Sequence, residues 1–128
     1  MSNPVVHFEI VTKDAQASRE FYRNAFGWTI ESPYQGANIA DYTSISTNDS
    51  RGIAGGIGTP PEGYDGHVTF YVGVTDVTAK LRELEGLGAQ TMMPATELPG
   101  LGFSIALFKD PQGHTVGLVS IPAEGEEK

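Results

Sequence analysis

The stretch VVHFEIVTKDAQASREFYRNAFGW, residues 5–28, decides the fold. Its first part alternates between two faces, as a half-buried strand does, with Phe8 on an apolar face and His7 and Glu9 on the opposite one. An amphipathic helix must then follow to cover the apolar face, because uncovered apolar surface costs about 25 cal/mol per Å² in water.

The second part of this stretch predicts that helix over residues 15–26, AQASREFYRNAF. Asp14 can cap its N-terminus, and Gly27 can end it in the left-handed conformation. The predicted apolar stripe of the helix consists of Ala17, Phe21, Ala25 and Phe26. Three extended runs follow, at residues 28–32, 37–46 and 51–58, and they complete a βαβββ module over about residues 4–58.

The same pattern restarts after a turn-rich linker, TPPEGYDG, at residues 59–66. A second module is predicted over about residues 67–122, with Asp76 as the helix cap and Gly88 as the helix end. The apolar face of its first strand carries Val68, Phe70, Val72 and Val74, and the opposite face carries His67, Thr69, Tyr71 and Gly73.

The two modules have similar spacing. Gly27 follows His7 by 20 residues and Gly88 follows His67 by 21, which favours an internal duplication with the two histidines at equivalent positions. A pseudo-two-fold axis would then bring His7 and His67 together in a partly polar cavity. The alternative is a solvated sheet face on which both histidines are surface residues.

Composition narrows the class of protein. We expect one domain over residues 1–128, since this length buries enough surface to fold alone. The net charge of −8 has the wrong sign for binding nucleic acid, and no apolar run is long enough to cross a membrane. Without cysteines the chain forms no disulfides, and without a signal-peptide pattern we expect a cytoplasmic protein.

Three segments resemble the vicinal oxygen chelate superfamily, which contains glyoxalases, bleomycin resistance proteins and extradiol dioxygenases. These are the stretch at residues 5–28, the restart GHVTFYVGVTDV and the ending FKDPQGHTVGLV. The resemblance implies an α+β fold in which two βαβββ modules form a cupped eight-stranded mixed sheet. It also implies a homodimer, a small-molecule pocket inside the cup and, in the enzyme members, a metal site.

The ligand positions that this resemblance implies fall on His7 and His67, for a divalent metal such as Zn, Ni, Mn or Fe. The positions where the family carries a carboxylate are occupied by Gly55 and Gly117 instead, so two imidazoles alone leave the site incomplete. Glu9 could complete it, but holding a neighbouring histidine or a cationic substrate is the favoured role, and Glu9 is also the candidate general base.

The sequence thus predicts a pocket protein with two alternatives left open. One is a lyase or dioxygenase with a degenerate metal site or none, and the other is a binding protein that sequesters a ligand or drug without chemistry. The predicted pocket residues are His7, Glu9, His67, Thr69 and Tyr71.

Overall fold

The computed structural model of the chain describes residues 2–33, 41–98 and 100–123. Its elements are β1 (Val5–Val11), α1 (Ala15–Phe26), β2 (Thr29–Pro33), β3 (Thr43–Ser46), β4 (Gly55–Gly58), β5 (His67–Val74), α2 (Val77–Gly86), β6 (Gln90–Glu97), β7 (Ser104–Lys109) and β8 (Thr115–Ser120). Neither helix of the described ranges has the length and hydropathy that a membrane span requires.

The strands form one open sheet in the order β2-β3-β4-β1-β5-β8-β7-β6. The β1/β4 and β5/β8 pairs are parallel, whereas β2/β3, β3/β4, β6/β7 and β7/β8 are antiparallel. The predicted α+β class with an eight-stranded mixed sheet is confirmed, and each half has the order of a βαβββ module.

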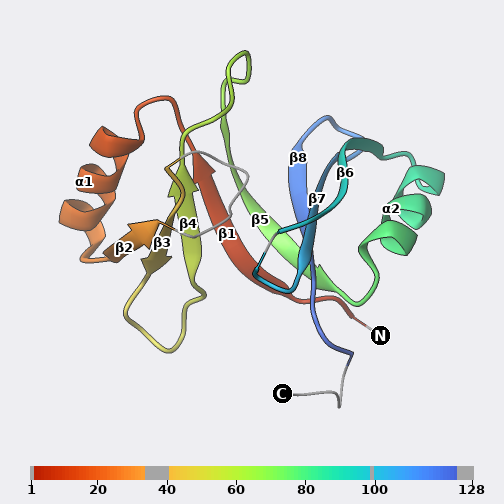
Figure 1. The fold of residues 1–128 in the computed structure, drawn as a ribbon, viewed down its shortest axis with the longest axis horizontal. Coiled ribbons are helices and arrows are strands. Elements are labelled where there is room, and N and C mark those ends of the chain that lie inside the picture. Colours follow the sequence, from red (N-terminus) through yellow and green to blue (C-terminus); the bar gives the residue numbers. More distant parts are fainter. Residues whose placement is uncertain (1, 34–40, 99, 124–128) are drawn as a thin grey trace. The chain divides into compact units, whose positions relative to one another are not determined.

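The chain separates into two compact units, residues 7–69 and residues 1–6 with 70–128. Each has its own hydrophobic core. In unit 7–69, α1 lies against β2 to β4 (Figure 1), and the buried core is Ile10, Ile45 and Ile57, with Phe8, Tyr22, Trp28 and Ile30 packed around it. In the other unit, α2 lies against β6 to β8, over a core of Val74, Val77, Leu81, Ala106, Phe108, Val116 and Leu118.

Helix α1 begins and ends where the sequence predicts. The Asp14 side chain accepts a hydrogen bond of 3.0 Å from the Ala17 backbone N–H, and Gly27 adopts a left-handed φ of 72°. The predicted apolar stripe is wrong, however, because Phe21 and Phe26 are 61% and 60% exposed. The covered face instead runs through Ala15, Ser18, Arg19 and Tyr22, which follow the helical repeat as well but include polar residues.

Helix α2 confirms its predicted cap. Asp76 accepts a hydrogen bond of 3.0 Å from the Ala79 backbone N–H, and Val77 and Leu81 are buried. The helix ends at Gly86, two residues before Gly88, which has a left-handed φ of 104°.

The faces of β5 differ from the prediction at its beginning. Val68 and Phe70 are 73% and 43% exposed, although Val74 is buried as expected. Helix α2 packs over β6 to β8. Thr69 and Tyr71, on the face predicted to be polar, are buried instead.

Candidate functional site

A buried carboxylate is the centre of the candidate site, which lies entirely within unit 7–69. Glu9 is only 2% exposed. Its Oε1 accepts a hydrogen bond of 3.1 Å from the Tyr42 hydroxyl, and its Oε2 lies 2.7 Å from Nε2 of His67. Because a buried charge is stable only when it is paired and hydrogen-bonded, these two contacts make the burial of Glu9 possible.

The glycine beside Glu9 makes room for Tyr42. In the parallel pairing of β1 with β4, Glu9 lies beside Gly56, and Gly55 lies beside Phe8. A Cβ atom on Gly56 would overlap the Tyr42 ring. The missing side chain at Gly56 therefore allows the phenol to reach the carboxylate.

His7 extends the network on the Tyr42 side. Its Nε2 lies 2.8 Å from the Tyr42 hydroxyl oxygen. Since that hydroxyl donates its hydrogen to Glu9, its oxygen accepts from His7, which must carry its proton on Nε2. Burial lowers the pKa of His7, while the nearby Glu9 charge raises it less strongly. His7 is thus a neutral donor at pH 7.

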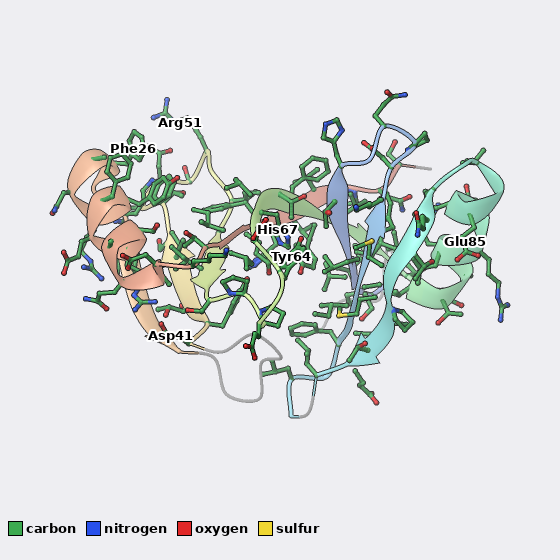
Figure 2. The ribbon with its side chains drawn as sticks, turned by 90° about the horizontal axis from the view of Figure 1, so that it is seen from above. Phe26, Asp41, Arg51, Tyr64, His67 and Glu85 are labelled. Carbon is green, nitrogen blue, oxygen red and sulfur yellow. The ribbon has the colours of Figure 1, made fainter. Side chains whose placement is uncertain are left out.

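Tyr64 extends the network on the other side. Its hydroxyl lies 2.6 Å from Nδ1 of His67, and Figure 2 shows the two side chains next to each other. The His67 side chain is only 9% exposed, so both of its ring nitrogens have a buried or half-buried partner. The surface position that was the alternative for this histidine is wrong.

The loop that carries Tyr64 is held by a turn in its middle and by a close approach near its end. A turn closes with a hydrogen bond of 3.1 Å from the Tyr64 backbone N–H to the Pro61 carbonyl oxygen, and Gly63 in this turn has a φ of 90°. Gly66, with a φ of 107°, comes so close to the Val11 carbonyl oxygen that a Cβ atom would collide with it. The loop between β4 and β5 thus has a defined path.

Of the predicted pocket residues, the structure brings His7, Glu9 and His67 into one hydrogen-bonded network. Thr69 is buried on β5, and Tyr71 belongs to the other unit, where its ring fills the space beside Gly117. Tyr42 and Tyr64 are members of the network that the sequence does not predict. Tyr64 carried one usable signal, because it is the only aromatic residue of the linker and stands between two glycines.

The equivalence predicted for the two histidines is wrong by two residues. His7 precedes its helix cap Asp14 by seven residues (14 − 7), but His67 precedes Asp76 by nine (76 − 67). Counted from the caps, Thr69 corresponds to His7 and Tyr71 corresponds to Glu9. The strand registers agree, since Glu9 lies beside Gly56 and Tyr71 lies beside Gly117.

The residues present do not fit a divalent metal with three protein ligands. Nε2 of His7 and Nε2 of His67 are directed at Tyr42 and Glu9, and both Glu9 oxygens already accept hydrogen bonds. Rings occupy the space at Gly55 and Gly117, the two predicted carboxylate positions, and at Gly56 as well. Across the described ranges, no three His, Cys, Asp or Glu side chains gather as a metal-holding group.

Solved structures share this fold. A hypothetical protein from Bacillus halodurans has a TM-score of 0.70 at 11% identity, with 99% of this chain and 100% of that chain covered. A Streptomyces coelicolor methylmalonyl-CoA epimerase in complex with 2-nitronate-propionyl-CoA has a TM-score of 0.65 at 20% identity, with 96% and 97% covered.

Curated sequence relatives are more similar but longer. The Mycobacterium tuberculosis protein named "Putative glyoxylase CFP32" is 31% identical over 114 residues, which are 86% of this chain and 42% of that protein. The anthracycline biosynthesis protein DnrV of Streptomyces peucetius is 28% identical over 123 residues, with 83% and 42% covered. The chain therefore spans less than half the length of these relatives.

The family model described as Glyoxalase/Bleomycin resistance protein/Dioxygenase superfamily matches residues 5–118, which include the whole Glu9 network. The resemblance seen in the sequence is thereby confirmed. This chain belongs to the glyoxalase/bleomycin resistance protein/dioxygenase superfamily.

Proposed function

We propose that this chain is a metal-independent small-molecule-binding domain of its superfamily. The observation that carries the proposal is the saturation of Glu9, whose two oxygens are taken up by Tyr42 and His67. A divalent metal would have to replace both contacts and would still lack a third protein ligand in a usable position. Direct polar contact with a ligand is the use of this network that its geometry favours.

Metal titration tests the first half of the proposal. After treatment with a chelator, we expect no stoichiometric binding of Zn²⁺, Ni²⁺, Mn²⁺ or Fe²⁺ by calorimetry under anaerobic conditions. The control variant is His114→Ala. The His114 side chain is 77% exposed, so weak metal binding by this imidazole would be lost in the variant. One-to-one binding that His7→Ala and His67→Ala both abolish would contradict the proposal and support a metal-dependent lyase or dioxygenase.

The ligand is proposed to be a cationic or neutral organic molecule rather than an anion. The net charge of −8 and the buried Glu9 disfavour anionic ligands through long-range and local repulsion. The name of DnrV suggests anthracyclines as probes, and the name of CFP32 suggests glyoxalase-type substrates.

A ligand screen separates these classes. We expect an anthracycline with an amino sugar to raise the melting temperature of the protein more than the anionic adduct of methylglyoxal and glutathione does. The aglycone without the amino sugar is the matched control for charge. A response to the glutathione adduct alone, lost in His67→Gln, would instead favour the glyoxalase-like alternative.

The homodimer that the resemblance implies stays a prediction. Phe21 and Phe26 lie on the uncovered side of α1, and exposed aromatic side chains that cluster in this way are typical of interaction surfaces. Analytical ultracentrifugation over a range of concentrations measures the association, and Phe21→Glu is expected to weaken it if this surface takes part.

A further inference from the structure

We propose that Glu9, His67 and Tyr64 form a proton-transfer triad in which the Tyr64 hydroxyl is the reacting group. This inference rests on the proposed function, since it gives the metal-independent site its chemistry. The three side chains form a continuous line of contacts. Glu9 Oε2 lies 2.7 Å from His67 Nε2, and His67 Nδ1 lies 2.6 Å from the Tyr64 hydroxyl oxygen. In this arrangement a carboxylate orients an imidazole, and the imidazole can act as a base toward a hydroxyl group.

The tautomer of His67 follows from the carboxylate. An ionised Glu9 only accepts hydrogen bonds, so the Nε2 atom of His67 must carry the proton that it donates to Oε2. The neutral imidazole then presents the lone pair of Nδ1 to the Tyr64 hydroxyl, which donates to it. Tyr42 reinforces this direction, because its own hydroxyl donates to the other Glu9 oxygen.

The exposure of the three side chains increases from Glu9 to His67 to Tyr64. The Glu9 and His67 side chains are 3% and 9% exposed, whereas Tyr64 is half-buried in the loop between β4 and β5. A ligand can therefore reach the phenol more readily than the two groups behind it. Tyr64 is the candidate catalytic residue, and His67 and Glu9 are positioning residues that act through it.

The step that this geometry supplies is removal of a proton from a small molecule. The Tyr64 oxygen takes the proton of an acidic C–H or O–H group while its own proton moves to Nδ1 of His67. The substrate is left as an anion, and the imidazolium lies between the phenol and the Glu9 carboxylate, so charge is conserved. The reverse transfer returns the proton. An uncharged or cationic substrate suits this step, because Glu9 repels an anion.

The test uses no substrate and no metal. An arylsulfonyl fluoride reacts with an activated phenol, so that an O–S bond forms, the S–F bond breaks, fluoride leaves and the phenolic proton passes to the base. We expect Tyr64 to be labelled about 100-fold faster than Tyr22, in keeping with the usual contribution of a positioned base. Tyr22 is the matched reference because it is also half-buried but stacks on Trp28, at 5.4 Å between ring centroids. Peptide mapping by mass spectrometry assigns each label.

Three variants test whether fast labelling of Tyr64 comes from activation of its hydroxyl by His67 or only from its exposure to the reagent. In His67→Gln, the side-chain amide can still donate to Glu9, but the acceptor at the Nδ1 position is lost, so labelling of Tyr64 should fall to the rate of Tyr22. In Glu9→Gln, one of the two acceptor oxygens becomes an NH2 donor. Where this NH2 faces Nε2 of His67, the ring carries its proton on Nδ1 and no longer accepts from Tyr64, so labelling should fall as well. Tyr64→Phe should remove the fast label altogether.

The outcomes are decisive in each direction. Equal labelling rates for Tyr64 and Tyr22, or fast labelling that survives in a folded His67→Gln protein, would overturn the triad. Thermal unfolding of each variant confirms that it is folded. Because the assay is run in chelator, a metal-binding result from calorimetry would contradict the proposed function without altering this readout, so the two failures are distinguishable.

Discussion

The two units carry different residues at the same position of the first strand of their βαβββ modules. In unit 7–69, the first strand carries Glu9 beside Gly56, and the ring over this glycine comes from Tyr42. In the other unit, the first strand carries Tyr71 beside Gly117, and Tyr71 itself supplies the ring over the glycine. Both glycines are needed for a ring to lie flat against the sheet.

The difference shows how one duplicated module can hold a charge and the other none at that position. A carboxylate on the first strand requires two donors, which unit 7–69 recruits from β5 and from the segment before β3. The tyrosine at the same position in the other unit fills the space beside its glycine with its own ring. The buried carboxylate and its two partners therefore lie in unit 7–69.

The largest expected effect comes from removing the carboxylate. Glu9→Ala leaves the buried donors of Tyr42 and His67 without their acceptor, and we expect a loss of about 3 kcal/mol in the free energy of unfolding. Glu62→Ala, in the exposed part of the loop, is the control and should change stability by less than about 0.5 kcal/mol. Urea unfolding measures both, and similar values for the two variants would show that Glu9 does not organise the unit.

The next effect tests the two glycines against each other. Gly56→Ala and Gly117→Ala each force a Cβ atom into a ring, and overpacking of this kind costs about 2 kcal/mol. Shrinking the ring with Tyr71→Leu should recover more stability in Gly117→Ala than Tyr42→Leu recovers in Gly56→Ala, because Tyr42 also donates to Glu9. Double-mutant cycles measure the two recoveries, and equal values would remove the distinction between the units.

A smaller effect should be the same in both units. Asp14→Ala and Asp76→Ala each remove one helix cap with a hydrogen bond of 3.0 Å, at a cost of about 1 kcal/mol. Replacement by Ser at either position should restore most of the loss. Thermal unfolding that shows one cap to be dispensable would mean that its helix is held by packing alone.

The smallest expected effect is a dependence of stability on pH in unit 7–69. Burial lowers the folded-state pKa of His7, so the unfolded chain binds more protons as the pH falls below the usual histidine pKa of 6.5. Stability should therefore decrease from neutral to mildly acidic pH, and the Glu9 charge limits the decrease. His7→Gln should flatten this part of the profile, whereas His114→Gln, at an exposed position, should not.

Local signals in the sequence predicted much of the fold. Alternation, the caps Asp14 and Asp76 and the left-handed Gly27 are properties of a few neighbouring residues, and they located β1, α1 and α2. The inward face of α1 was missed because Arg19 lies on it, and a hydrophobic pattern gives no weight to a charged side chain.

The sequence predicts three residues of the candidate site but not their hydrogen-bond partners. Strand parity placed His7, Glu9 and His67 on inward faces, because parity survives a shift of two residues. The register did not follow from the spacing of the histidines. Both strands begin nine residues before their helix caps (14 − 5 and 76 − 67), but His67 is the first residue of β5 and His7 is the third residue of β1. Tyr42 and Tyr64 come from segments without a periodic pattern, and only the folded chain brings their hydroxyls to Glu9 and His67.

The close approach of Gly66 to the Val11 carbonyl restricts the length of the loop between β4 and β5. The Thr12 backbone N–H donates to the Gly58 carbonyl oxygen at the start of this loop, and Gly66 lies against Val11 at its end. The number of residues between them is therefore fixed by two adjacent anchors at the end of β1. Exposed side chains such as Glu62 and Asp65 can vary freely, but an insertion of one residue would carry Tyr64 away from His67. Variation in this loop should therefore be common in composition and rare in length.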